Sequence, residues 1–209
     1  MFPLVIAETG LNRFLVALEN AAPGLRELRE GQESVLPSED GELILVGQAG
    51  PHCYLLEYSA TPFADSWGLL GRLAAELNCL VVATAHDPSE EQAEFFAARG
   101  GQTLRAYWQN PERTTAPYSE GQALASEEAV PLGAAGGAGL CAALRCLGFQ
   151  QMDHAEGFTR TPGDRWLTWG GDPLAVMDRY GSKAISDHVR AHMNPSYRWP
   201  TPKVRVGVE

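Results

Sequence analysis

Basic residues are scarce in this chain, and lysine is nearly absent. Lys183 and Lys203 are the only lysines, and 16 basic residues face 26 acidic ones, which gives a formal net charge of -10. A protein that holds nucleic acid through its phosphates needs a basic surface. The sequence therefore argues against nucleic acid as a partner.

Long apolar runs are missing as well. No uninterrupted apolar stretch reaches the roughly 20 residues that a helix needs to cross a bilayer, and MFPLVIAETG lacks the basic start and long apolar core of an export signal. We therefore expect a cytoplasmic protein with no membrane partner. With 209 residues and 44% apolar content, the chain can bury a core of its own. We predict one domain over 1–209, with a possible subdivision near 130–139.

The four cysteines form no CxxC pair, which disfavours a disulfide scaffold or a zinc knuckle. Three of them sit within apolar runs, so we expect mostly buried, reduced thiols.

Sequence motifs for catalysis are also lacking. No serine stands in a GxSxG elbow. The glycine run Gly133–Gly139 precedes a predicted helix, as phosphate-binding loops do, but it lacks their Lys-Ser/Thr ending, and a flexible linker is the favoured interpretation. We predict no enzymatic activity, no catalytic residues and no cofactor.

His188 and His192 offer the main alternative. Their spacing places two imidazoles on one face of a predicted helix, where they could share a zinc ion in a metal-assisted hydrolase. The HExxH form is missing, and a third ligand would have to come from Asp153 or His154. Two histidines facing solvent are the favoured reading, and we predict no metal site. A structural adaptor that binds a partner through its tail, 194–209, is a further alternative.

Hydrophobic periodicity predicts an α+β fold, with a mainly antiparallel sheet built from hairpins and flanked by helices. The predicted helices cover 11–22, 66–78, 140–147, 173–180 and 182–193. The predicted strands include 42–48, 53–58, 166–169 and the central strand 79–85, and residues 109–128 are expected to form a long surface connection.

Local rules conflict after the central strand. Asp87-Pro88-Ser89-Glu90 has the residues that start a helix, and Gly100 would end it. Against this, residues 103–108 alternate in the manner of a strand after Gly100-Gly101. We predict a hairpin around these glycines, with at most a short helical turn over 88–92.

In the middle of the chain, residues 66–128, a helix and buried strand (LLGRLAAELNCLVVATA) precede a hairpin (EFFAARGGQTLRAYW) and a charged loop (NPERTTAPYSEGQALASEE). This order resembles that of immunity proteins of bacterial polymorphic-toxin and secretion systems. The resemblance implies a toxin inhibitor of the kind found in type VI secretion and toxin–antitoxin pairs. Its partner would be a cognate toxin.

The distribution of charge agrees with such a partner. Residues 1–130 hold 19 acids and 7 bases, whereas 131–209 hold 7 acids and 9 bases. An acidic surface is complementary to a basic toxin cleft. We predict that the surface acids in the resembling region contact the toxin, namely Glu90, Glu91, Glu94, Glu112 and Glu120.

Overall fold

The structure is a computed structural model that describes residues 4–22, 25–27, 42–57, 67–149, 165–169 and 181–197. These residues form a nine-stranded sheet in the order β2-β9-β3-β4-β1-β5-β6-β7-β8, in which every neighbouring pair is antiparallel. The strands are β1 Leu4–Ala7, β2 Leu25–Glu27, β3 Glu42–Ala49, β4 His52–Glu57, β5 Leu80–Asp87, β6 Gln92–Arg99, β7 Gln102–Gln109, β8 Tyr118–Gly121 and β9 Arg165–Trp169.

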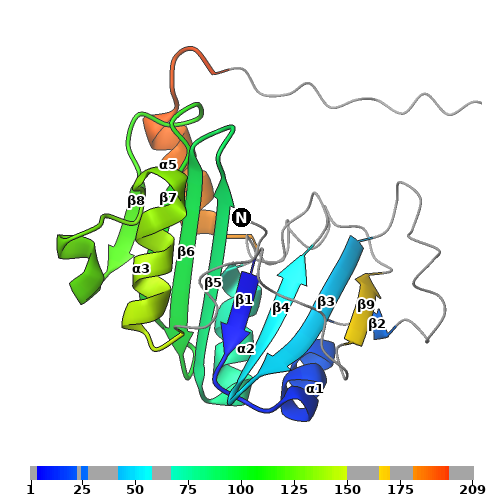
Figure 1. Cartoon of the computed structure of the whole chain (residues 1–209). Coiled ribbons are helices and arrows are strands. Elements are labelled where there is room, and N and C mark those ends of the chain that lie inside the picture. The colour runs from blue at the N-terminus through cyan, green and yellow to red at the C-terminus, as the bar shows by residue number, and fades with distance from the viewer. Residues whose placement is uncertain are drawn as a thin grey trace, which may run out of the picture.

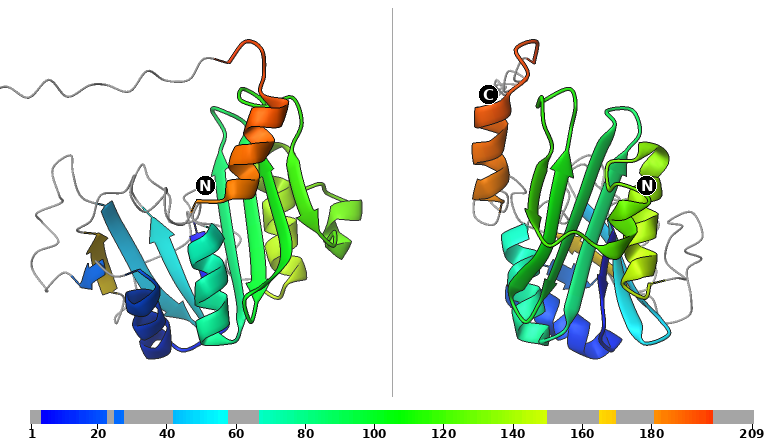
Figure 2. Two further views of the ribbon diagram at one scale, coloured as in Figure 1. Left: turned by 180° about the vertical axis from the view of Figure 1, so that it is seen from behind. Right: turned by 90° about the vertical axis from the view of Figure 1, so that its left-hand side faces the viewer.

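Helices cover both faces of this sheet (Figures 1 and 2). One core joins the sheet to α1 Leu11–Ala21, α2 Trp67–Leu77 and α5 Lys183–His192. The other core joins it to α3 Ala138–Cys146. Two short 3-10 turns, η3 Ala125–Glu128 and η4 Ala135–Gly137, precede α3. The α+β class with helices flanking an antiparallel sheet is confirmed.

The helix and central strand of the resembling region form as predicted. The buried side of α2 consists of the residues at helical spacing, from Leu69 to Leu77. Asn78 follows with a φ of 47°, the left-handed conformation that ends a helix. Strand β5 is buried along nearly its whole length because α2 covers one face and α3 lies on the other side of the sheet.

The hairpin after β5 is also confirmed. Gly100 and Gly101 have φ values of 56° and 84°, and two consecutive positive φ angles are what a two-residue hairpin turn requires. The predicted short helical turn over 88–92 is wrong. Residues 88–91 form a turn that joins β5 directly to β6, and pairing of residues 92–99 with β5 and β7 buries the side chains from Ala93 to Ala98 within the sheet.

Residues 109–128 are more ordered than a surface connection. They contain β8, which pairs with β7 at one edge of the sheet, and η3. The four residues of β8 include a serine, a glutamate and a glycine, and their sequence gives little indication of a strand. Pairing with the neighbouring strand β7 therefore determines that they form one. Strand β1 also lay outside the predicted elements, although it is completely buried between β4 and β5.

The glycine run is packed and does not behave as a free linker. Gly139 is buried against the preceding segment, and a Cβ at this position would lie 1.9 Å from the carbonyl oxygen of Pro131. A Cβ at Gly133 would lie 2.2 Å from Gln109 Oε1. Glycine is therefore required at 139, where the close contact is with backbone, whereas at 133 the contact is with the end of a side chain that can move aside.

Several predictions fall on residues outside the described ranges. These are the helix over 173–180, the ligand candidates Asp153 and His154, and the tail from 198 onward. Among the described residues, no helix has the length and apolar character needed to span a membrane.

Candidate functional site

The candidate site lies next to α5, where β5 and β7 end and β6 begins. The turn 88–91 joins β5 to β6, and the loop 110–117 leads from β7 to β8. The loop also contacts the end of α5, where the Thr115 amide donates to the His192 carbonyl at 2.9 Å. Two connections and one helix end thus meet at the same end of the sheet (Figure 1).

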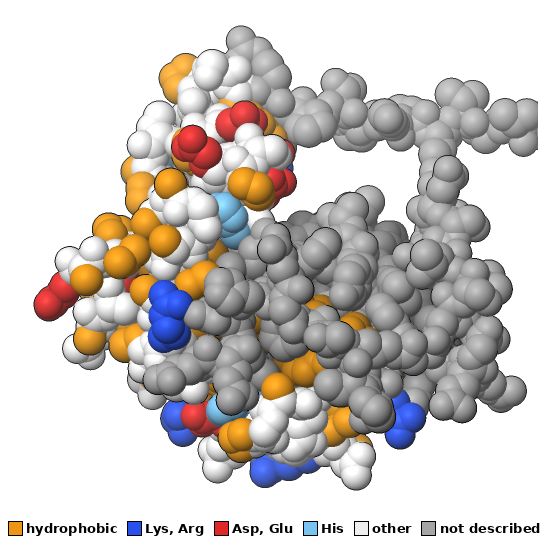
Figure 3. Space-filling model, viewed as in Figure 1, with side chains coloured by type: hydrophobic (Ala, Val, Ile, Leu, Met, Phe, Trp, Pro, Cys, Tyr) orange, Lys and Arg blue, Asp and Glu red, His pale blue; other side chains and the backbone are white. Residues whose placement is uncertain are grey.

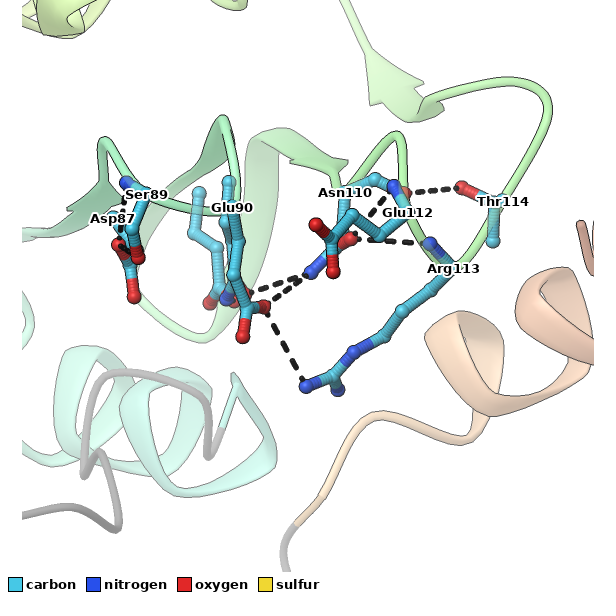
Figure 4. Close-up of polar contacts among 9 residues, drawn as sticks. Asp87, Ser89, Glu90, Asn110, Glu112, Arg113 and Thr114 are labelled. Carbon is cyan, nitrogen blue, oxygen red and sulfur yellow. Dashed lines mark hydrogen bonds and ion pairs between the residues drawn. The ribbon is translucent and has the colours of Figure 1, made fainter. Parts of the chain in front are cut away.

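Asn110 holds the two connections together and is completely buried. Its Nδ2 donates to Glu90 Oε2 at 2.9 Å and to Gln92 Oε1 at 3.1 Å. Its Oδ1 accepts from the amides of Glu112 and Arg113, both at 3.1 Å (Figure 4). One amide side chain therefore fixes the turn that carries Glu90 relative to the loop that carries Glu112.

Each connection is also ordered by its own polar side chains. In the turn, Asp87 Oδ1 accepts from the Ser89 amide at 2.9 Å and from Ser89 Oγ at 2.6 Å. These hydrogen bonds hold the pKa of Asp87 below its usual value, so the carboxylate is charged at neutral pH. In the loop, Thr114 is buried, and its amide donates to the Asn110 carbonyl at 2.9 Å.

Three of the predicted partner-binding acids are brought together here. Glu91 and Glu112 are exposed and Glu90 is half-exposed, and all three belong to the two connections. Arg113 lies beside them, with Nη2 3.8 Å from Glu90 Oε2. Figure 3 shows acidic side chains at this end of the molecule. Their contact with a partner stays a prediction.

Glu120 and Glu94 are placed differently. Glu120 lies on β8, where it is exposed and its carboxylate accepts a hydrogen bond from the hydroxyl of Tyr118. Glu94 is only 3% exposed, so its prediction as a surface acid is wrong. Side chains alternate along β6, and Glu94 is on the side of Phe96, which packs under the helices.

Tyr118 connects this edge of the sheet to α5. Its ring lies 5.9 Å from that of Trp67 on α2 and 5.5 Å from that of His188. Burial, together with the hydrogen bond to Glu120 and that residue's charge, raises the pKa of Tyr118 to about 12. The hydroxyl therefore remains protonated and continues to donate to Glu120 throughout the physiological range.

The rings of His188 and His192 lie on one side of α5, with their centroids 4.4 Å apart. His188 Nε2 is 2.9 Å from the Ala116 carbonyl oxygen, so this nitrogen carries the proton that the contact needs. Within the described ranges, no three His, Cys, Asp or Glu side chains converge in a way that would hold a metal ion. Two imidazoles alone fall short of a zinc site, which usually takes at least three protein ligands.

The cysteines follow the prediction only in part. All four are free thiols; Cys53 and Cys79 are buried, whereas Cys146 is exposed near the end of α3. Burial, together with the nearby Cys79, raises the pKa of Cys53 to about 11. A thiol with such a pKa is a poor nucleophile at neutral pH.

Sequence reasoning missed the residues that build the site. Asn110 and Asp87 were not among the candidates, although both precede a proline and have turn-forming side chains. That signal marks turns in general. Only the pairing of β5, β6 and β7 brings these two turns to one end of the sheet.

Comparison of the chain with family models, with curated proteins and with solved structures gives no match. Function is therefore inferred from the residues themselves.

Proposed function

We propose that this chain is an immunity protein that binds a cognate bacterial toxin and neutralises it by covering the toxin's active surface. The observation that carries the proposal is the acidic surface at the ends of β5, β6 and β7. Glu90, Glu91 and Glu112 come from two different connections at one end of the sheet, and buried Asn110 bonds to the Glu90 carboxylate and the Glu112 amide. We call these three residues the acidic end.

Order in the two connections favours binding. Side chains that are already fixed before a partner arrives lose less conformational freedom on association. Glu90 is fixed through Asn110, and the backbone of Glu112 is fixed by the same side chain. The acidic end should therefore lose little conformational freedom when it binds a complementary surface.

Charge complementarity suits a toxin with a basic cleft. Enzymes that cleave nucleic acid bind a polyanion, so their clefts are basic, and an acidic inhibitor would be attracted to them from a distance. The excess of acids over bases in residues 1–130 adds to this attraction. Such an inhibitor needs no chemistry of its own.

The test is co-expression with the toxin candidate encoded next to this gene. We expect the chain to restore growth and to co-purify with that toxin. The triple variant Glu90→Lys, Glu91→Lys, Glu112→Lys should weaken binding by roughly tenfold or more, mainly through slower association. Raising the salt concentration should slow association of the unchanged protein, because salt screens exposed charges.

A matched control carries the same change of net charge elsewhere. Glu19, Glu76 and Glu128 are exposed acids on α1, α2 and η3, and their replacement by lysine should affect binding much less. An equal loss of binding in both triple variants would show that the net charge of the protein governs association. The acidic end would then have no special part in it. The proposal fails if no adjacent toxin is neutralised or bound.

A further inference from the structure

Glu94 is a buried carboxylate with one unpartnered oxygen. Its Oε1 accepts from Nε2 of Gln92, which in turn accepts from Asn110, so the carboxylate is turned toward the acidic end. Its Oε2 is buried and has no hydrogen-bond partner in the part of the chain that the structure describes. An unpaired buried carboxylate oxygen is destabilising and calls for an explanation, such as a ligand that completes it.

Aromatic side chains lie on the same face of the sheet as Glu94. Glu94 is directly opposite Trp108 on β7, and Trp108 is opposite Tyr118 on β8. Directly opposed residues project from one face of a sheet. Phe96, the next residue on this face of β6, stacks with Trp67 at 5.5 Å. The other neighbour of Glu94 across the sheet is Ala85, whose side chain is a single methyl group.

The carboxylate and the aromatic rings together indicate that the ligand of Glu94 is a cation. Aromatic faces are electron-rich and attract cations, and a carboxylate oxygen accepts from a guanidinium or ammonium group. The surrounding acids, including Asp87 and the acidic end, repel anions. Arg113 already places a guanidinium 3.8 Å from Glu90, which shows that the neighbourhood accommodates a cation.

We propose that Glu94 and the adjacent aromatic rings receive a single basic side chain of the partner. Its guanidinium or ammonium group donates to Glu94 Oε2, and its aliphatic stem packs against Trp108. This inference rests on the proposed function and gives it a central anchor: the acidic end attracts the basic surface, and Glu94 binds one residue of it. A buried ion pair of this kind raises the affinity and the specificity of the complex beyond what the exposed acids alone provide.

The test uses small cations in place of the partner, so it does not depend on identifying a toxin. The probes are ethylguanidinium and n-butylammonium chlorides at millimolar concentration, compared with ethylurea and with sodium chloride at equal ionic strength. We expect both cations to raise the unfolding temperature of the full chain, and ethylurea and sodium chloride to leave it unchanged. In Glu94→Gln the apparent affinity for the cations should fall by roughly tenfold or more, whereas Glu128→Gln, an exposed acid on η3, should match the unchanged protein.

A second measurement separates ligand binding from a purely structural role. Without a cation, Glu94→Gln should unfold at a higher urea concentration than the unchanged protein, because the charge on the unpaired carboxylate is gone. Saturating ethylguanidinium should close this gap, since it stabilises only the protein that retains the carboxylate.

Equal responses to ethylguanidinium and ethylurea in the unchanged protein would overturn the inference, even if Glu94→Gln failed to fold. So would equal cation affinity in Glu94→Gln. Failure of toxin binding with a normal cation response would instead reject the proposed function while leaving the cation site in place.

Discussion

Arg105 and Glu127 form a buried ion pair on the opposite face of the sheet from Glu94. Their side chains are 5% and 13% exposed, with Arg105 Nη2 2.7 Å from Glu127 Oε2 and Nε 2.8 Å from Oε1. Arg105 also donates to Ser119 Oγ and to the Glu120 carbonyl, both at 2.9 Å. One guanidinium thus joins β7 to β8 and η3, and loss of its carboxylate partner would leave a buried charge unpaired.

The pair makes stability depend on pH. Burial alone would raise the pKa of Glu127, but hydrogen bonds from Arg105 and from the Leu124 amide outweigh it and hold the pKa below its usual value. Since the folded-state pKa is lowered, the stabilisation is present above the unfolded pKa and is lost as pH falls through the folded one. We expect Glu127→Gln to cost about 3 kcal/mol at pH 7 and to show a shallower loss of stability between about pH 5 and pH 3.

Urea unfolding at a series of pH values measures this effect. The neighbouring Glu128 is exposed, so Glu128→Gln should keep the pH profile of the unchanged protein. Identical profiles for Glu127→Gln and Glu128→Gln would show that the ion pair does not contribute as described.

At the scale of elements, α5 supports the loop that carries Glu112. The Asn194 amide donates to the Arg113 carbonyl at 2.8 Å, and Met193 forms a β-bridge with Thr114. Val189 on α5 is buried against the core that contains α2. The order of this part of the candidate site therefore depends on a helix more than 60 residues further along the chain.

Ser182 is the N-cap residue immediately before α5, and its replacement should loosen this support. Its Oγ accepts from the Ile185 amide at 3.2 Å and so caps the helix. We expect Ser182→Ala to weaken α5 by about 1 kcal/mol, seen as faster hydrogen exchange in α5 and at the Thr115 amide, which bonds to α5. Ser186→Ala, an exposed change inside the helix, should leave exchange slow; equally fast exchange in both would contradict the capping role.

At the scale of the whole molecule, the proposed inhibitor and the alternative hydrolase differ in metal content. A hydrolase built on His188 and His192 would bind zinc at about one ion per chain, because its chemistry requires the metal. The inhibitor needs none. We expect elemental analysis of protein purified without a histidine tag to find zinc far below one ion per chain. Stoichiometric zinc that disappears in the variant His188→Ala, His192→Ala would favour the hydrolase.

Local sequence determined those elements whose signals lie within a few residues. The apolar face of α2, the left-handed Asn78, the Gly100-Gly101 turn and the Ser182 cap are all set by neighbours in the chain. Hydrophobic periodicity and turn chemistry report such features directly. They predicted the α+β class and most of the strands, including the choice of a hairpin after β5.

Tertiary structure alone decided the rest. Strand β8 exists because β7 offers an edge to pair with, and Asn110 joins two turns that only strand pairing brings together. In the sequence, nothing distinguishes Glu94 from the surface acids. In the structure, the alternation of side chains along β6 places it beneath the helices, beside Trp108. Local patterns cannot report such contacts, because burial and pairing depend on residues that are distant in the chain and become neighbours only when the sheet forms.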